Sequence, residues 1–563
     1  MGRTLLFAAW MLALPMPAIA GWASNGSDVT PWFGMQFPDA LVTDGSGGAY
    51  LFWFGVRPDG INFDRRVLRL TRDGETASGW PVSGDVVSVQ AGAVRARADG
   101  AGGVFYTWLE SEILAQTATL RVGHISSQRT FLAQSFDDLG VVAFNQPVLD
   151  PDASSQAFVA WTHDSAGVTS LRLVHLEASL QPVAGWPTSG VAFGGARPEV
   201  ARAVVPDGQG GAYVLAHSTP TASLHLYRVT SSGLAAGWPS SGVEVRSGVV
   251  FSPYDEYPTV PSSGGVIVTW VEMRTGGQKD VFCQRVLETG AVAPGWPADG
   301  VLISGNPIDE DWPLAISDGA GGALVAWQYG FVNNSSIYAN RILVSGQLDS
   351  DWPAGGLPVR LHDNFGILSS LVTDGEGGFI TAWLDSRVGC DVYAQRIDSA
   401  GEVRWNSNGL RVAAAAAPGT GRLPLLASDE SSNAILAWID TRTGSPLDID
   451  SWDIFATRIS SSGAVPSPRI PSAINLETPW PNPTRESSTV WLELAHSQPV
   501  RVRVLDAAGR VVRKLSSETR PAGRTVIQWD GRDEDGRDVR QGLYFIQTRV
   551  EEGEASARIV VVR

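Results

Sequence analysis

Cysteine is almost absent from this chain of 563 residues, and its scarcity excludes two classes of protein. The two cysteines, Cys283 and Cys390, lie two sequence repeats apart at non-equivalent positions, so we expect no disulfide between them. The seven histidines are scattered and show no metal-type spacing with one another or with cysteine. The sequence therefore predicts neither a disulfide scaffold nor a Cys/His metal centre, and we assign no residues as metal ligands.

Basic charge is also in short supply. Lysine occurs only at Lys279 and Lys514, and 42 Lys and Arg residues face 58 Asp and Glu residues, which gives a formal net charge of −16. Nucleic-acid-binding proteins present basic surfaces to the phosphate backbone, so this balance argues against a nucleic-acid partner.

Long hydrophobic runs are missing as well. The apolar stretch from Leu5 to Leu14 is too short to span a membrane, and no later segment qualifies as a transmembrane segment. Arg3 precedes this stretch and Ala18-Ile19-Ala20 follows it, which is the layout of a secretory signal peptide. We predict a signal peptide at residues 1–20 and a protein that is secreted or held at the outer cell surface.

What the chain has in abundance is a repeat. An Asp, which most often opens an Asp-Gly-x-Gly-Gly turn, is followed nine residues later by a Trp. The pairs are Asp44/Trp53, Asp99/Trp108, Asp152/Trp161, Asp318/Trp327, Asp374/Trp383 and Asp429/Trp438, with weaker copies at Asp207/Ala216 and Pro261/Trp270. The eight units recur every 53 to 57 residues, a period typical of stacked or circular repeat proteins.

One unit indicates which repeat architecture this is. Glycines supply the positive φ angles of a tight turn, and the run that follows, such as Phe379 to Trp383, is apolar at every position. Strands covered on both faces have this composition. Units of about 55 residues are too short for a two-sheet sandwich, which takes about 100 residues. Four radially arranged strands per unit predict an all-β fold, an eight-bladed β-propeller over residues 21–465.

The start of the mature chain predicts how the ring closes. Gly21 to Gly26 resembles the fourth-strand motif of other repeats, such as Gly237 to Gly242, whereas the eighth repeat lacks that motif. We predict that residues 21–29 supply the missing outer strand by pairing with residues 454–459. Closure would remove the free edges of an open array.

A cation recurs late in the third strand of each unit: Arg69, His124, His175, Arg228, Arg285, Arg341, Arg396 and Arg458. One interpretation is a ring of cations that binds an anion. The other is a structural contact within each blade, to Asp385 or Asp440 or their equivalents. We favour the structural interpretation, because functional groups usually break the symmetry of a repeat.

After a proline-spaced linker at residues 466–471, the pattern changes to strict alternation, with Val500, Val502 and Val504 on one face and arginines between them. Alternation of this kind is typical of half-buried antiparallel strands, so residues 472–563 are predicted to form a small β-sandwich. The acidic turn from Asp530 to Gly536 does not have EF-hand spacing, and we interpret it as a hairpin turn.

Several motifs in this region follow one known layout: Pro479 to Pro483, Val504 to Val512, Trp529 to Asp533, and Gly542 to Phe545. The region resembles the Ig-like domain named after the flagellar hook-capping protein. It is also similar to C-terminal sorting domains of the type IX secretion system of some Gram-negative bacteria. The resemblance implies a sorting or attachment domain that engages secretion machinery. The repeat itself resembles those of uncharacterised secreted bacterial propellers and implies no catalytic residues.

Three connectors from consecutive repeats differ from the short, bland ones elsewhere. They predict a ligand site of carboxylates beside aromatics, composed of Tyr254, Asp255, Glu256, Tyr257, Asp309, Glu310, Asp311, Trp312 and Asp363. Carboxylates can bind sugar hydroxyls while a ring stacks on the apolar face of the sugar. The same groups suit calcium, and they are also ordinary loop residues.

We therefore predict a monomeric, non-catalytic binding protein for a carbohydrate or protein ligand, with no cofactor other than a possible calcium ion. The alternative is a secreted hydrolase or lyase that acts on polysaccharide.

Overall fold

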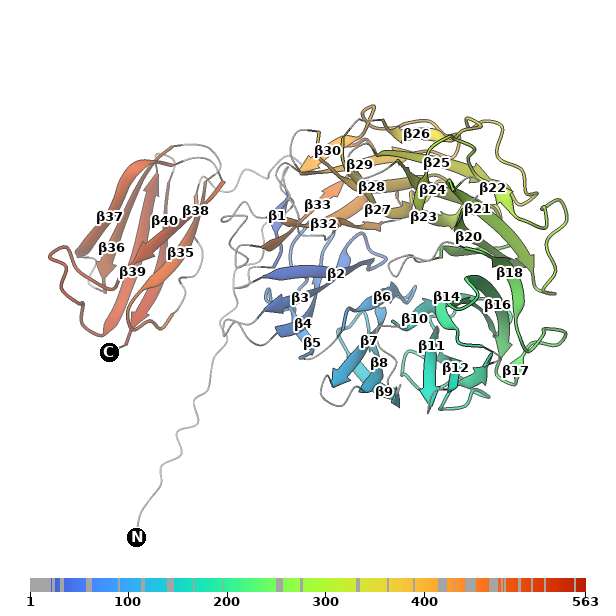
Figure 1. The fold of residues 1–563 in the computed structure, drawn as a ribbon. Helices are drawn as coiled ribbons and strands as arrows, with labels where there is room; N and C mark the ends of the chain where they lie inside the picture. Colours follow the sequence, from blue (N-terminus) through green and yellow to red (C-terminus); the bar gives the residue numbers. More distant parts are fainter. Residues whose placement is uncertain are drawn as a thin grey trace, which may run out of the picture. The chain divides into compact units, whose positions relative to one another are not determined.

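The computed structural model describes residues 22–562 except for a set of short stretches. These are residues 23–25, 31–34, 57–62, 90–91, 113–116, 139–145, 166–167, 196, 250–256, 274–276, 331–334, 362–363, 388–389, 414–422, 430, 441–451, 465–473, 477–478, 480–481, 495–497, 508–509, 521–522 and 551–552. The predicted signal peptide at residues 1–20 lies outside the described part. The chain divides into two compact units, residues 22–466 and a second unit that holds residues 467–563. All regular elements in the described residues are strands (Figure 1).

The first unit is built from antiparallel sheets, which we call blades in chain order. Blade 1 holds β2 (Gln36–Thr43), β3 (Ala49–Val56), β4 (Phe63–Leu70) and β5 (Asp85–Ser88). Blade 2 holds β6 (Arg95–Ala98), β7 (Val104–Glu112), β8 (Thr117–Ile125) and β9 (Phe131–Asp138). Blade 3 holds β10 (Val148–Pro151), β11 (Ala157–Ser165), β12 (Val168–Leu176) and β13 (Val191–Phe193). Blade 4 holds β14 (Val200–Pro206), β15 (Ala212–Ser218), β16 (Ser223–Thr230), β17 (Gly233–Leu234) and β18 (Val243–Ser247).

The second half repeats this organisation. Blade 5 holds β19 (Thr259–Ser262), β20 (Gly265–Met273), β21 (Lys279–Leu287) and β22 (Val301–Leu302). Blade 6 holds β23 (Glu310–Ser317), β24 (Ala323–Tyr329), β25 (Ser336–Ile342) and β26 (Leu357–Arg360). Blade 7 holds β27 (Gly366–Thr373), β28 (Phe379–Asp385), β29 (Asp391–Ile397) and β30 (Leu410–Ala413). Blade 8 holds β31 (Leu425–Ser428), β32 (Ala434–Asp440), β33 (Asp453–Ile459) and β1 (Ser27–Asp28).

The first strand of each blade contacts the first strand of the next, and the contacts form a cycle. The order is β2, β6, β10, β14, β19, β23, β27 and β31, and β31 in turn contacts β2. Figure 1 shows the same arrangement, in which the blades follow one another around a centre from blue to orange. A closed ring of four-stranded sheets is a β-propeller, so the predicted fold class is confirmed.

Residues from the N-terminal end complete blade 8. Ser27 and Asp28 of β1 pair antiparallel with Ala456 and Phe455 of β33, which is the pairing that the sequence predicts. The indole N–H of Trp22 donates to the carbonyl of Arg72 in blade 1, at 2.8 Å. Trp405 of blade 7 makes the same contact with Ser461 of blade 8, at 3.1 Å. The non-contiguous strand therefore makes the contact that contiguous strands make elsewhere in the ring.

The cores lie between neighbouring blades. All seven residues of β28 and of β32 are buried, because the two faces of each blade are covered by the preceding blade and by the next one. One core cluster, for example, joins Ile380 and Val392 of blade 7 to Leu436 and Phe455 of blade 8. The apolar composition of these strands therefore reflects burial on both faces.

The repeated Asp and the repeated cation form one motif. Oδ1 of Asp374 accepts hydrogen bonds from the backbone N–H groups of Glu376 and Gly378, both at 2.8 Å, and Oδ2 pairs with Arg396 at 2.9 Å. Glycine is required at the end of this turn, because a Cβ on Gly378 would lie 2.3 Å from the carbonyl oxygen of Ile397. Charged hydrogen bonds of this kind are stronger than neutral ones.

This geometry corrects one prediction from the sequence. The cation does make a contact within its blade, but Arg396 and Arg458 pair with Asp374 and Asp429 of the turns, not with Asp385 and Asp440. The turn Asp lies between β27 and β28 at the end of the sheet where the cation lies, whereas Asp385 lies at the other end of β28.

The second unit contains two sheets. One holds β34 (Ile474–Leu476), β35 (Ser488–Leu494) and β38 (Gly523–Trp529), and the other holds β37 (Val511–Arg520), β36 (Gln498–Asp506), β39 (Gly542–Val550) and β40 (Gly553–Val561). Val500, Val502 and Val504 are buried in its core, as the alternation predicts. The Asp533 N–H donates to the carbonyl of Arg537, which closes the acidic segment as a hairpin turn.

Candidate functional site

The two faces of the ring carry different connections. Successive turns of an antiparallel sheet lie at opposite ends, so the glycine turns and the third-to-fourth-strand turns share one face, which we call the turn face. The second-to-third-strand loops and the connectors between blades share the opposite face, which we call the connector face. The predicted ligand site belongs to the connector face. Four of its residues, Tyr254, Asp255, Glu256 and Asp363, lie outside the described residues.

The structure brings Asp309 and Asp311 together around one lysine. The backbone N–H of Lys279 donates to Oδ1 of Asp309 at 3.0 Å, and its Nζ pairs with Oδ2 of Asp311 at 2.5 Å. Lys279 begins β21 in blade 5, whereas the two aspartates lie at the start of blade 6. The pair therefore ties two blades together at the connector face, and both side chains remain partly exposed to solvent.

The side chain of Glu310 points into the protein, away from this surface. Its side chain is fully buried, and its Oε2 accepts a long hydrogen bond of 3.4 Å from the N–H of Val281. Burial raises the pKa of Glu310 to about 7, and the nearby Asp280 charge acts in the same direction, while a hydrogen bond from Ser304 opposes both. Alternation along the strand explains why this carboxyl lies inside while its two neighbours lie at the surface.

Trp312 is the most unusual residue of the predicted site. It is 42% exposed, although it lies on β23, the innermost strand of blade 6. Its φ angle is +50°, which bulky side chains rarely adopt, and it precedes Pro313, which normally restricts a residue to extended conformations. The ladder between β23 and β24 shifts register between Asp311 and Leu314, so Trp312 sits in a β-bulge that turns it out of the sheet.

Tyr257 does not lie at the surface. It is 3% exposed and stacks on His217 of blade 4, with ring centroids 5.5 Å apart. It belongs to the core between blades 4 and 5. The described part of the predicted site therefore reduces to Asp309, Asp311 and Trp312 at the surface, with Glu310 beneath them.

The sequence interpretation missed the residues that complete this surface. Lys279 is central to it, and its rarity as one of two lysines was the available signal. Gln278 donates to the carbonyl of Asn306, and exposed Ile308 and Met273 flank the same segment. Met273 lies directly across the ladder from Lys279. An aromatic ring, two aliphatic side chains and an ion pair thus share one patch, which we call the Trp312 patch.

The described residues contain no group of three or more His, Cys, Asp or Glu side chains placed to hold a metal ion. Within the same residues, no helix is long and apolar enough to cross a membrane. Cys283 and Cys390 are free thiols.

The fold and the site together define a β-propeller followed by an Ig-like domain. Residues 484–554 match the FlgD Ig-like domain family. No curated protein matches the sequence.

Solved structures with similar folds come from several proteins. The β-propeller domain of the Trilobed protease from Pyrococcus furiosus is 10% identical, with 64% of this chain and 94% of that chain covered and a TM-score of 0.36. An ulvan lyase of a new polysaccharide lyase family is 10% identical, with 80% and 98% covered and a TM-score of 0.40. An acylaminoacyl peptidase from Pyrococcus horikoshii is 8% identical, with 70% covered and a TM-score of 0.38, and this chain spans 54% of its length.

Proposed function

We propose that this protein is an exported, non-catalytic binding protein whose propeller holds a carbohydrate or protein ligand at the Trp312 patch. The observation that carries the proposal is the backbone conformation of Trp312. A tryptophan at φ +50° before a proline is costly, on the order of 1–3 kcal/mol, and such strain persists where the surroundings enforce it, most often at binding and active sites.

The chemistry of the patch favours a carbohydrate over the other ligand classes. An exposed indole ring offers a flat apolar face for a sugar ring, and the carboxylates of Asp309 and Asp311 can accept hydrogen bonds from sugar hydroxyls. Lys279 already neutralises part of their charge, so the patch presents polar groups without a strong field.

The alternative, a secreted hydrolase or lyase that acts on polysaccharide, has one supporting feature. The pKa of Glu310 is raised to about 7, which would suit a general acid. However, this carboxyl is fully buried, and a general acid must come within hydrogen-bond reach of its substrate. The binding function therefore fits the described carboxylates better.

Substitution of Trp312 by Asn separates binding from folding. Asn tolerates positive φ, so strain relief should offset part of the lost packing, and we expect the free energy of unfolding to change by no more than about 2 kcal/mol. Retention in native gels that contain soluble polysaccharides should fall to background for the polysaccharide that retains the wild-type protein.

Ala222→Asn is the matched control, because Ala222 also has a positive φ, of 46°, and lies in a second-to-third-strand loop of blade 4. This variant should keep full binding. Equal retention of Trp312→Asn and the wild type would place the ligand site elsewhere.

The export part of the proposal rests on the two ends of the chain. The predicted signal peptide would deliver the protein across the inner membrane. The terminal domain, which matches the FlgD Ig-like family at residues 484–554, would act as the sorting or attachment module, since it resembles type IX sorting domains.

Truncation of the protein after Pro471 in the native host tests whether the terminal domain directs export. The propeller has its own core and its own closed ring, so it should fold with an unchanged melting temperature but remain in the periplasm. Cell fractionation and a thermal melt of the recovered protein measure both effects. If the truncated protein reaches the surface or the medium at the normal level, the domain serves attachment only.

A further inference from the structure

Four of the blade interfaces are held by the same tryptophan contact, which we call the latch. The indole N–H of a tryptophan before the outer strand donates to a turn carbonyl of the next blade. The donors and acceptors are Trp22 and Arg72 at 2.8 Å, Trp238 and Glu288 at 2.9 Å, Trp296 and Val344 at 3.1 Å, and Trp405 and Ser461 at 3.1 Å. At the interface of blades 6 and 7, Trp352 occupies the same position with its indole nitrogen buried and without a hydrogen bond.

A glycine in the next blade makes room for the latch. A Cβ on Gly74 would lie 2.6 Å from the ring of Trp22, and one on Gly463 would lie 2.7 Å from Trp405. Each of these glycines also has a positive φ angle, of 82° and 79°. At these two interfaces the tryptophan ring therefore lies directly on the turn, where only glycine leaves enough space.

At two of the interfaces that lack this contact, those of Trp80 and Trp186, the turn of the next blade is changed. In blade 2 the turn glycine is replaced by Arg129, which keeps the positive φ of 64° but carries a Cβ. Trp80 of blade 1 therefore cannot lie where Trp22 and Trp405 lie. In blade 4 the turn residue Gly233 has a φ of 119°, and a Cβ placed on it would meet nothing within 4 Å, so Trp186 of blade 3 is not packed on it.

A cavity opens on the turn face at each of these two interfaces. The one beside Trp80 measures about 520 Å³, and the one beside Trp186 about 390 Å³. Both volumes lie in the range of small-molecule sites. Neither Trp80 nor Trp186 gives its indole N–H to a described residue, so both donors are available to a ligand.

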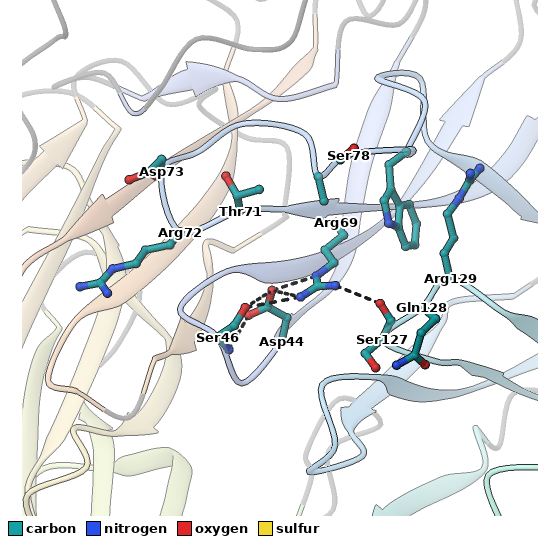
Figure 2. A pocket seen from close by; sticks show the side chains of 12 residues that line it. Asp44, Ser46, Arg69, Thr71, Arg72, Asp73, Ser78, Ser127, Gln128 and Arg129 are labelled. Carbon is teal, nitrogen blue, oxygen red and sulfur yellow. Dashed lines mark hydrogen bonds and ion pairs between the residues drawn. The ribbon is translucent and has the colours of Figure 1, made fainter.

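The charges in the cavity beside Trp80 are already balanced. Figure 2 shows Asp44 bound to Arg69, and Arg69 also donates to the carbonyl of Ser127. Arg129 makes a bidentate ion pair with both carboxylate oxygens of Asp85. Its guanidinium group also stacks over the ring of Trp80, with the guanidinium carbon 5.4 Å from the ring centroid. Arg72 and Asp73, one charge of each sign, also line the cavity, so the lining together with Asp85 carries no net charge and favours neither an anion nor a cation.

The cavity beside Trp186 adds a second unused polar group. His175 is 3% exposed, its Nε2 contacts Oδ2 of Asp152 at 3.0 Å, and its Nδ1 is buried without a partner. Burial lowers the pKa of His175 against the opposing effect of Asp152. Its face stacks on Phe158 with a centroid distance of 3.8 Å. A buried polar atom without a partner is costly unless a ligand or water supplies one.

We infer that these two interblade cavities are sites for neutral saccharide units, distinct from the Trp312 patch on the opposite face. An indole N–H, serine hydroxyls and turn carbonyls match the hydroxyl groups of a sugar, and the lining of the cavity beside Trp80 offers no net charge to an ion. Because both cavities open on the same face, a polysaccharide can occupy them together, and the linked sites would bind it more tightly than either alone.

The first test needs no ligand. Trp→Phe removes the indole N–H and keeps most of the ring. Trp238→Phe and Trp296→Phe break a latch, so each should lower the melting temperature. Trp80→Phe and Trp186→Phe remove a donor that the protein does not use, so neither should. A drop for Trp80→Phe equal to that for Trp238→Phe would show that the N–H is engaged within the fold and would overturn the inference.

The second test uses saturation-transfer NMR with a mixture of methyl glycosides of glucose, galactose, mannose, rhamnose and N-acetylglucosamine. At least one should receive saturation from the wild type and from the Trp238→Phe/Trp296→Phe control. The Trp80→Phe/Trp186→Phe variant should bind it about five- to tenfold more weakly, as expected for a lost hydrogen bond.

The two proposals fail separately. No transfer from the wild type to any glycoside, or undiminished transfer from Trp80→Phe/Trp186→Phe, overturns the interblade sites. Transfer that is lost only in Trp312→Asn would overturn them as well and would support the patch on the connector face.

Discussion

Removal of residues 22–29 should lower the free energy of unfolding of the propeller by on the order of 5 kcal/mol or more, because it strips three kinds of contact from blade 8. The first is the ladder of Ser27 and Asp28 with β33. The second is the latch from Trp22, which is buried against blade 1. The third is the packing of Val29, which has no exposed surface. The deletion would also leave β33 as an open sheet edge.

Two chains compared by chemical denaturation, one starting at residue 22 and one at residue 30, measure this loss directly. Trp22→Ala is the milder variant, and truncation of a buried tryptophan costs about 3–5 kcal/mol. Its matched control is Trp405→Ala, which removes the same latch from a blade that is contiguous in sequence. We expect Trp22→Ala and Trp405→Ala to lower the free energy of unfolding by equal amounts. An unchanged midpoint for the shortened chain would show that the N-terminal strand does not hold the ring together.

The architecture could be predicted because its determinants are local. A turn Asp that binds two backbone N–H groups, followed by an apolar run that ends in Trp, specifies one hairpin, and eight copies specify the ring. The closure of blade 8 by the N-terminal strand could also be predicted from the sequence, because Trp22 and Gly26 repeat the motif of the other outer strands. A Cβ on Gly26 would lie 2.4 Å from Trp438, as one on Gly409 would from Trp383.

Contacts between blades could not be predicted from the sequence, because the repeat period does not indicate which residues contact one another across an interface. The repeat pattern did not show that the latch is absent at the turns of Arg129 and Gly233, where the structure has the two cavities. The same holds for Trp312. It was predicted to lie in a connector but lies on β23, and its positive φ follows from a bulge that no local motif indicates.

Asp385 is the strongest case of an interblade contact hidden from the sequence. It accepts hydrogen bonds from Arg360 of blade 6 at 2.7 Å and from the indole of Trp383 at 2.9 Å, and it also pairs with Arg387. Both Asp385 and Arg360 are fully buried. Arg360 also donates to the carbonyls of Ser335, Asn364 and Phe365, so its charge is enclosed by acceptors.

Asp385→Asn should cost about 3–5 kcal/mol at neutral pH, because it leaves the guanidinium of Arg360 buried without its counter-charge. Burial alone would raise the pKa of Asp385, but the hydrogen bonds from Arg360, Arg387 and Trp383 outweigh it and hold that pKa below the usual range. The stabilisation is therefore present above the ordinary Asp pKa of about 4 and is lost as the pH falls through the depressed value in the folded protein.

Urea unfolding of the wild type and of Asp385→Asn at pH 7 and pH 3 measures how much stability the variant loses and how that loss depends on pH. The difference in the free energy of unfolding between the two proteins should be smaller at pH 3 than at pH 7. Glu376→Gln is the control in the same blade, since Glu376 pairs with Arg396 but is largely exposed to solvent, and water screens such pairs. It should leave the midpoint almost unchanged. A gap for Asp385→Asn that is as small as that for Glu376→Gln, or one that widens at pH 3, would contradict a buried ion pair between blades 6 and 7.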